Sequence, residues 1–521
     1  MSHLLCGLAA NPALPPELVD RLVARAVSAT AADPDDDIAA DLAYALSERT
    51  DLTPAQVLAL SAHDEYAALR LARGGLLTAA DVDPVARPRL ALVLLDERAG
   101  PAEWARLLAA HPDGEVRWTL ASAPGLPLDV AQSLAADPDI DVVAELALWT
   151  DAPEVAARLA VHPHAEVRRK AASNEATPPA ALAALITGEG LAPAESCRVC
   201  DREEVPFTHD PLCTLPDWGL FGDEACAGGH ESTVRDMLHT AAENRATPPG
   251  AAALLAGHPS MRIRRALAER ADLPASLYAR LAEDSHPAVR QAVVANPAID
   301  EPLIRALAAA DDDRDIDRSA LARHPRVPLD VLAHLARTVR IRPEPLPRIE
   351  AASPEELAEL AASPHAAVRM LAARRRDLPA EVRDALAADP DAAVLKTIAP
   401  HPGITEDRLR AMVARHGVRV LVKVASNPDA SAALLADLAR HDPPVRRAFR
   451  EIASHPNATV QALLPCLAVE ETRARAAGHP ALPPSVLVGL LTGEDHAAAE
   501  AAAANPALPR PVMEELIAPR A

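Results

Sequence analysis

The sequence predicts an all-α solenoid made of two-helix repeats that stack in chain order, and three observations support this fold class. A phrase with a valine, usually an arginine after it, and a proline turn about eight residues later recurs along the chain, as in HPAVRQAVVANPAID (286–300). Aromatic residues make up only 2% of the 521 residues, so no large aromatic core is available. The 50 prolines recur at a fixed phase beside expected helix starts. Self-similarity of this kind is the signature of repeat architectures.

The valine marks the first helix of each repeat. Apolar residues follow it at helical spacing, as Val289, Ala292 and Val293 do at i, i+3 and i+4. The helix is expected to end at Asn-Pro, His-Pro or a similar pair, because proline disfavours the helical conformation of the preceding residue. The anchor positions recur mostly at intervals of 24 to 27 residues and are Val116, Val143, Val167, Ile263, Val289, Val368, Val394, Val420 and Val445.

A second helix follows each first helix. In LPLDVAQSLAADPD (126–139), Leu126, Val130 and Leu134 lie on one stripe. Proline near the first turn costs little, and a nearby Asp, Thr or Ser can cap the helix. Neither short helix can bury its apolar face alone, so neighbouring repeats must stack.

The arginine after the anchor has two interpretations. It could form an anion-binding stripe along a groove, or it could bond an acidic group or a carbonyl of the adjacent repeat. Aspartates in phase, such as Asp137 and Asp389, favour the internal ladder. The arginines concerned are Arg117, Arg168, Arg264, Arg290, Arg369, Arg446 and Arg473. The recurring turn histidines are also expected to be structural, and they are His111, His162, His286, His324, His401, His455 and His479.

Between residues 186 and 232 the repeat is absent, and four of the six cysteines gather there. Their spacing is C-x2-C-x12-C-x12-C, and they are Cys197, Cys200, Cys213 and Cys226. Phe207, Trp218, Phe221 and several glycines lie in the same segment. A module this short cannot fold on apolar burial alone.

A metal ion would stabilise the module. Cys-x-x-Cys holds one ion from a tight knuckle, and two distant cysteines complete a tetrahedron. His209 and His230 are reserve ligands, because Cys226-x3-His230 offers either donor. The preferred ion is structural zinc, and the alternative is a [4Fe–4S] cluster. Redox dithiol chemistry and free thiols stay open. Cys6 and Cys466 stand alone within repeats, where cysteine is usually a small buried apolar residue.

The phrase V-R-x-x-x-A-x-N-P-x-x-P-x-x-x-L-x-x-L-A-x-D-P-D resembles the leucine-rich repeat variant family over nearly the whole chain outside the insert. Four stretches fit closely, namely 122–139, 163–185, 289–309 and 477–491. The resemblance implies a right-handed superhelix in which an α-helix alternates with a 3₁₀ helix. The chain is also similar to HEAT-like repeats, which share the Val-Arg helix and an Asp–Arg ladder. Many units here are longer than the family's, so α-helical second helices are also expected. A family member carries a 4Fe–4S cluster in an N-terminal cysteine-rich domain, whereas the module here is internal.

We expect three segments along the chain. An N-terminal repeat array covers 1–185, the cysteine-rich metal module covers 186–232, and a C-terminal array covers 233–521. The stretch 337–350 (RTVRIRPEPLPRIE) is expected to be a degenerate repeat or a kink.

Charge and composition exclude several classes of partner. The net charge is −22, with 74 acidic against 52 basic residues, which opposes nucleic acid and anionic membranes. No apolar run approaches the roughly 20 residues of a membrane helix. The start of the sequence reads as a repeat and not as a signal peptide, and the cysteines do not form a distributed disulfide framework. A cytoplasmic protein is expected.

The preferred function is a non-enzymatic scaffold that binds a protein or peptide on its solenoid surface, with basic partners favoured by the acidic chain. No Walker loop, G-x-S-x-G or H-E-x-x-H motif is present. The alternative is a redox- or metal-responsive regulator that carries the cluster. An enzyme such as a repeat-fold DNA glycosylase or pigment lyase is the least favoured hypothesis.

Overall fold

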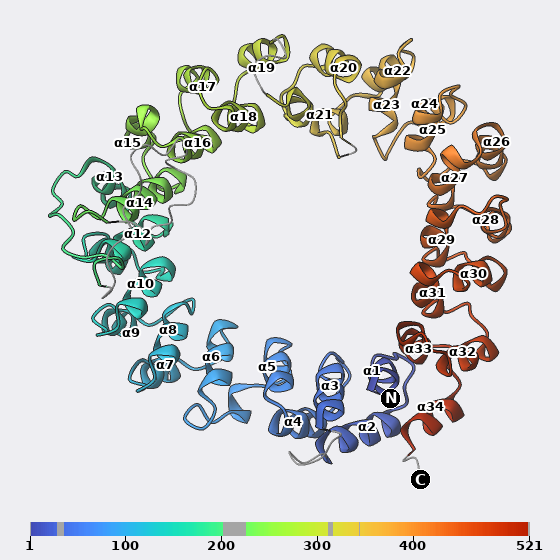
Figure 1. Cartoon of the computed structure of the whole chain (residues 1–521), viewed down its shortest axis with the longest axis horizontal. Helices are drawn as coiled ribbons and strands as arrows, with labels where there is room; N and C mark the ends of the chain where they lie inside the picture. The colour runs from blue at the N-terminus through green and yellow to red at the C-terminus, as the bar shows by residue number, and fades with distance from the viewer. Residues whose placement is uncertain (1, 29–35, 202–225, 311–315, 343, 519–521) are drawn as a thin grey trace. The chain divides into compact units, whose positions relative to one another are not determined.

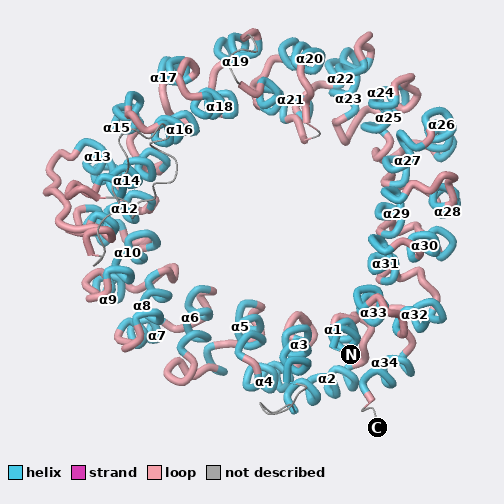
Figure 2. Tube along the Cα trace, in the orientation of Figure 1, coloured by secondary structure: helices cyan, strands magenta, loops and turns pink. Residues whose placement is uncertain are grey.

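The computed structural model describes residues 2–28, 36–201, 226–310, 316–342 and 344–518. The regular elements in these ranges are helices joined by short loops, and a β-bridge pairs His164 with Ser196 (Figure 2). The chain divides into two compact units: unit 1 comprises Met1–Leu77 with Ile349–Ala521, and unit 2 comprises Thr78–Arg348. The predicted all-α solenoid of two-helix repeats is confirmed in both.

Each unit consists of two parallel rows of helices, with the first helices on the inner side of that unit's curve (Figure 1). We call these the first-helix row and the second-helix row. The first-helix row of unit 2 contains α6 (Pro88–Asp96), α8 (Gly114–Ala121), α10 (Ile140–Trp149), α12 (Ala165–Ser173), α14 (Glu231–Glu243), α16 (Met261–Glu269), α18 (Pro287–Ala295) and η4 (Arg318–Arg323). Its second-helix row contains α7 (Ala102–Ala109), α9 (Leu128–Leu134), α11 (Pro153–Ala160), α13 (Pro179–Thr187), α15 (Pro249–Ala253) continued by η2 (Leu254–Gly257), α17 (Ala275–Leu281), α19 (Glu301–Ala308) and α20 (Leu329–Thr338).

Unit 1 repeats this arrangement. Its first-helix row contains α23 (Ala366–Ala373), α25 (Ala392–Ile398), α27 (Val418–Ala425), α29 (Arg446–Ala453), α31 (Glu470–Ala477), α33 (His496–Ala503), α1 (Ser2–Ala9), α3 (Asp36–Leu46) and α5 (Glu65–Arg73). Its second-helix row contains α22 (Pro354–Ala361), α24 (Ala380–Leu386), α26 (Glu406–His416), α28 (Ala432–Ala439), α30 (Val460–Leu467), α32 (Pro484–Leu491), α34 (Arg510–Ile517), α2 (Pro16–Ser28) and α4 (Pro54–His63). Two short helices, η1 (Ala79–Asp81) and α21 (Pro347–Glu350), lie at the boundaries between the units.

The helices begin where the sequence supplies caps. Second helices such as α22 start with a proline at the first helical position, here Pro354, whose missing N–H would have had no partner there. Ser353 accepts from the Glu356 amide, and Glu356 accepts from the Ser353 amide, which completes a capping box. The prolines are therefore ordered helix starts, as their phase predicted.

The recurring arginines form an internal ladder. Arg117 donates to Asp137 from the next repeat at 2.7 Å and to the His111 carbonyl of its own turn at 2.8 Å. The same bidentate geometry joins Arg264 to Asp284 and Arg369 to Asp389. The ladder prediction is thus confirmed at these positions and at Arg473, which bonds Asp495. Arg168 and Arg290 bond carbonyls instead, and Arg446 is exposed.

Asparagines and histidines form a second ladder inside the stack. Buried Asn427 donates to the carbonyls of Ala399 and His401 in the preceding repeat, and its Oδ1 accepts from the Asp429 amide. In the next repeats His455 bonds the Asn427 carbonyl, as His479 bonds that of His455. Asn174, Asn244, Asn296 and Asn505 repeat the asparagine pattern. These side chains act within the fold, as the sequence predicted.

Three repeats use an arginine in place of the asparagine. Arg270 donates to the carbonyls of Ala242 and Asn244 and forms a bidentate pair with Asp272, two residues later. Arg49 with Asp51 and Arg375 with Asp377 do the same. The sequence signal is Arg-x-Asp-Leu, which the sequence analysis missed, because it shares no residue type with Asn-Pro.

Within unit 1 the N-terminal helices continue the C-terminal stack. Asn11 is fully buried and donates to the carbonyls of Ala503 and Asn505, at 2.9 and 2.8 Å. This is the same bond pair that Asn505 makes to its own predecessor. Leu4 packs with Ala499 and Ala503, and α1 lies against α33. The ladder therefore runs from the last repeat into the first, although the two are at opposite ends of the sequence.

The degenerate stretch predicted at 337–350 coincides with the boundary between units. α20 ends at Thr338 and the chain then lacks a full helix until α22, apart from α21. The expected three-segment division stays a prediction, since the compact units divide the chain at other residues. No helix within the described ranges is long and apolar enough to cross a membrane.

Candidate metal centre

Three cysteines and one histidine of the insert converge on one point. Cys197 and Cys200 lie in the segment after α13, and Cys226 and His230 lie just before α14. Their three sulfurs and a ring nitrogen all lie within 4.8 Å of one another. The candidate site therefore joins the two ends of the insert.

The spacing of the donor atoms fits a tetrahedral ion. Cys200 Sγ lies 3.6 Å from both Cys197 Sγ and Cys226 Sγ. His230 Nδ1 lies 3.5 Å from Cys200 Sγ and 3.7 Å from Cys226 Sγ. With Zn–S of about 2.3 Å and Zn–N of about 2.0 Å, a regular tetrahedron places sulfurs about 3.8 Å apart and sulfur and nitrogen about 3.6 Å apart. A zinc-sized ion fits these four atoms without rearrangement.

The site is closed by protein. Cys197, Cys226 and His230 are buried, and Cys200 alone is exposed. The Nε2 of His230 lies 3.1 Å from the Ala194 carbonyl, which orients the ring so that Nδ1 faces the sulfurs. Four protein donors leave no open coordination position, which is typical of structural zinc sites.

The sulfurs are unfavourable neighbours without a cation. Partial removal from water, together with the close Cys197 and Cys226, raises the pKa of the Cys200 thiol to about 12. Burial also raises the pKa of Cys226, but hydrogen bonds such as that from the Gly228 amide outweigh it and lower this pKa below its usual value. A divalent cation among the sulfurs would remove the repulsion between thiolates.

The module is attached to the solenoid through the start of α12. The Ala165 amide donates to the Ser196 carbonyl and the Glu195 amide to the Pro163 carbonyl, each at 2.8 Å. Val199, Cys197 and Cys226 pack with Ala165 in one apolar cluster. The knuckle therefore shares its small core with a first helix.

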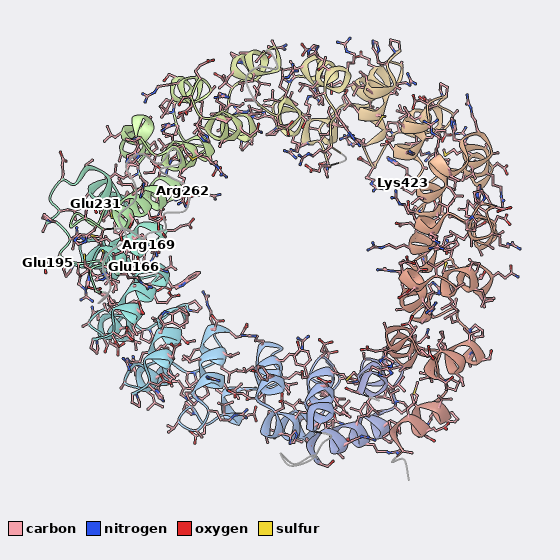
Figure 3. All side chains as sticks on the ribbon, viewed as in Figure 1. Glu166, Arg169, Glu195, Glu231, Arg262 and Lys423 are labelled. Atoms are coloured by element: carbon pink, nitrogen blue, oxygen red, sulfur yellow. The ribbon has the colours of Figure 1, made fainter. Side chains whose placement is uncertain are left out.

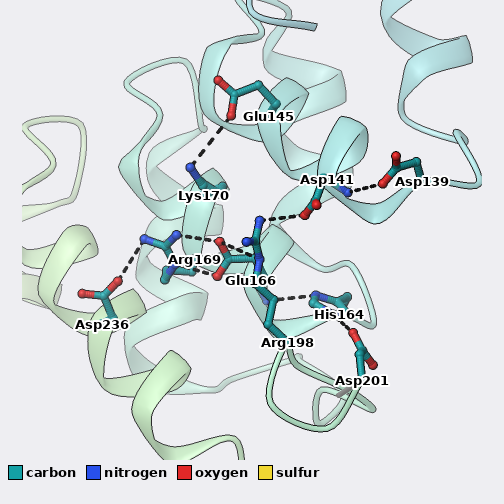
Figure 4. Close-up of polar contacts among 10 residues, drawn as sticks. All are labelled: Asp139, Asp141, Glu145, His164, Glu166, Arg169, Lys170, Arg198, Asp201 and Asp236. Carbon is teal, nitrogen blue, oxygen red and sulfur yellow. Dashed lines mark hydrogen bonds and ion pairs between the residues drawn. The ribbon is translucent and has the colours of Figure 1, made fainter. Parts of the chain in front are cut away.

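Polar contacts extend this attachment across three first helices (Figure 4). His164 bonds Asp201 at 2.7 Å. Arg198 bonds Asp141 of α10 at 2.7 Å and lies 3.7 Å from Glu166 of α12. Buried Glu166 also bonds Arg169, which reaches Asp236 of α14, as the all-atom view places them on neighbouring helices (Figure 3). The ion pairs connect the module to the helices on both sides.

Of the residues predicted as ligands, the structure brings together Cys197, Cys200 and Cys226. His230, predicted only as a reserve, is the fourth donor. Cys213 and the other reserve, His209, lie outside the described residues. Cys6 and Cys466 lie in α1 and α30, away from the cluster, and burial raises the pKa of Cys466 to about 12.

The signal for His230 was present but incomplete. Its backbone adopts the left-handed conformation (φ 57°) directly before the first turn of α14. Two glycines precede it, of which Gly228 has φ 104°. Cys-Ala-Gly-Gly-His before a helix is therefore a tight turn that returns the histidine to the cysteine, which the residue spacing alone did not reveal.

Comparisons with known proteins add little to this description. No protein-family profile and no curated protein matches the chain. Among solved structures it is similar to one reported as "Structure of the Pds5-Scc1 complex and implications for cohesin function". That match has 14% identity and a TM-score of 0.19, and it covers 83% of this chain and 66% of that chain. A TM-score this low supports no shared arrangement or function, so the fold assignment rests on the repeats themselves.

Proposed function

We propose that this chain is a non-enzymatic scaffold that binds a protein or peptide partner on its first-helix rows. Stacked repeats expose extended surfaces of this kind. Membership of the leucine-rich repeat variant family, or of the HEAT-like repeats, belongs to the same proposal. It is supported by the Val-Arg phrase and by the Arg–Asp ladder between repeats.

The observation that carries the proposal is the placement of exposed aromatic residues. In a chain with 2% aromatic residues, four large rings of the described part are exposed, and all four lie on first helices. Tyr44 and Tyr66 lie on α3 and α5 of unit 1, and Trp118 and Trp149 on α8 and α10 of unit 2. Exposed Tyr and Trp are the residues most enriched at binding hot spots. A solvent-facing helix has no structural need for them.

The metal centre is proposed as a structural zinc site held by Cys197, Cys200, Cys226 and His230. Its closed donor set and its contacts to α12 support a structural role. Cys213, outside the described residues, is the alternative fourth ligand, and four thiolates would also suit a [4Fe–4S] cluster.

The remaining parts of the proposal follow from charge and cysteine state. A net charge of −22 disfavours nucleic acid and anionic membranes as partners. Each cysteine within the described ranges is free of disulfides, which supports a reducing, cytoplasmic location. A basic protein surface would be attracted to the chain as a whole.

Site-specific photo-crosslinking in the native host tests the scaffold. A photoreactive residue replaces Tyr66 or Trp149 on first helices and, as matched controls, the similarly exposed Leu58 on α4 or Leu128 on α9. We expect protein adducts from the first-helix positions and few from the controls. Equal yields from both rows, or none from the first helices, would contradict the proposal.

A further inference from the structure

The exposed face of three consecutive first helices of unit 1 is basic, although the chain is strongly acidic. The helices are α25, α27 and α29, which pack against one another in order. We call their exposed cations the basic patch, and its members are Lys396, Arg419, Lys423, Arg446, Arg447 and Arg450. It contains two of the three lysines in the sequence. Figure 3 shows Lys423 on the inner side of the curve of unit 1.

The helix period explains why these cations share a face. On α27, Val420, Leu421, Val424 and Ala425 are buried in the stack, which leaves Arg419 and Lys423 outside, four residues apart. On α29, Phe449 and Ile452 are buried in the same way, and the arginines surround them on the exposed side. The patch is a continuous surface because each helix presents the same positions.

The patch cations differ from the other arginines in having no fixed partner. The ladder arginines bond aspartates or carbonyls, as described above. Within the described part of the chain, no ion pair or side-chain hydrogen bond joins any of the six patch cations to another residue. The partly buried Glu451 is the one acidic residue that α25, α27 and α29 contain. Six cations with so little compensation are the surface of this chain that most attracts an anion.

We propose that the basic patch binds a short acidic segment of a protein partner, which specifies one docking site on the scaffold proposed above. Adjacent packed helices are about 8–10 Å apart, so three helices span about 20 Å. An extended peptide of about six to eight residues covers that length. Val418, half exposed beside Arg419, and partly buried Val422 offer apolar contact between the charges.

A protein segment suits the patch better than a nucleic acid. Beyond α29, the next first helix begins with exposed Glu470 and Glu471, and Glu500 is exposed on α33. A longer polyanion would meet these carboxylates, whereas a short acidic peptide would not. The ring of Phe449 is buried, so the patch offers no aromatic platform for bases.

Fluorescence anisotropy with the full chain tests the proposal. The probe is a fluorescein-labelled peptide of about eight residues in which glutamate alternates with leucine. The comparison probes are the same peptide with glutamine for glutamate and a single-stranded DNA of similar length. The patch variant is Arg419→Glu/Arg450→Glu, and the control is Arg21→Glu/Arg158→Glu. The control residues are exposed on second helices and change the net charge equally.

We expect the glutamate peptide to bind, the patch variant to weaken binding about tenfold or more, and the control to stay within about twofold. Binding should also weaken between about 50 and about 300 mM salt, and the glutamine peptide should not bind. If charge reversal prevents folding, Arg419→Gln/Arg450→Gln replaces it. Absence of peptide binding, equal losses in both variants, or tighter binding of the DNA would overturn the inference. Crosslinks from Tyr66 and Trp149 would survive such a result, so this failure is distinct from failure of the scaffold itself.

Discussion

Single buried polar residues hold the repeats in register, and His401 shows the consequence for pH. It is 2% exposed, and its carbonyl accepts from Asn427 of the next repeat. Burial, followed by the charge of Arg376, lowers the pKa of His401 to about 4. Burial likewise lowers the pKa of His324. These imidazoles are neutral inside the stack at neutral pH.

The stability of unit 1 should therefore fall below neutral pH. An unfolded histidine takes up its proton near pH 6.5, whereas folded His401 does so only near pH 4, so the unfolded state gains the extra proton in between. The contribution is complete above pH 6.5 and is lost toward pH 4. Urea unfolding at about pH 7.5 and about pH 5.5 should show a loss of about 1 kcal/mol in the wild type that is absent in His401→Gln. The exposed His63→Gln is the control, and an unchanged pH dependence in His401→Gln would contradict the assignment.

At this scale the sequence predicts function-bearing residue types better than their partners. Cys-x-x-Cys identified Cys197 and Cys200, and the in-phase aspartates identified the ladder. The choice of His230 depends on the left-handed turn before α14 and on the Ala194 carbonyl, 36 residues earlier in the chain. Spacing along the sequence does not encode such a contact.

At the scale of elements, the insert lies between α13 and α14 and holds the start of α14. His230 is both a candidate ligand and the residue at the N-terminal cap of α14. α14 in turn packs on α12, to which the module is attached. Metal binding is therefore expected to order the junction between two repeats, because site formation and folding share one free energy.

Removal of the metal should loosen this junction and leave other repeats intact. After chelation, hydrogen–deuterium exchange should increase in residues 226–240 and in the first turn of α12. Protection of α29, in unit 1, serves as the internal reference and should not change. Uniform loss of protection, or none at 226–240, would show that the module does not stabilise α14.

The helices themselves were largely predictable, because proline phase and apolar period act locally. The Arg-x-Asp-Leu repeats were not, since arginine and asparagine perform one task with unrelated chemistry. The exposed aromatic residues and the basic patch also required the structure, because only packing shows which face of a short helix is left outside.

At the scale of the whole molecule, the contact of α1 with α33 makes unit 1 one stack that includes both sequence ends. Gly7 lies where α1 crosses α33, and a Cβ there would lie 2.3 Å from the Glu500 carbonyl oxygen. Glycine within a helix costs about 1 kcal/mol relative to alanine. The close approach of the two backbones explains why a glycine is found there.

Substitution of this glycine tests the contact. Gly7→Ala should destabilise unit 1 by about 1–3 kcal/mol, since the clash is with backbone. The control Gly489→Ala, in α32, meets nothing within 4 Å and should stabilise by about 0.5–1 kcal/mol. Thermal or urea unfolding of both variants provides the comparison. If Gly7→Ala stabilises as the control does, α1 is not packed on α33 in solution.

The most direct test of the account is the metal content and visible spectrum of the anaerobically purified protein. We predict a colourless protein with one zinc per chain, and loss of that zinc in Cys226→Ser and His230→Ala but not in the matched Cys466→Ser. A brown protein that contains iron and absorbs near about 400 nm would contradict the zinc site and support the [4Fe–4S] regulator. Protein without metal that folds normally in all three variants would contradict a metal centre altogether.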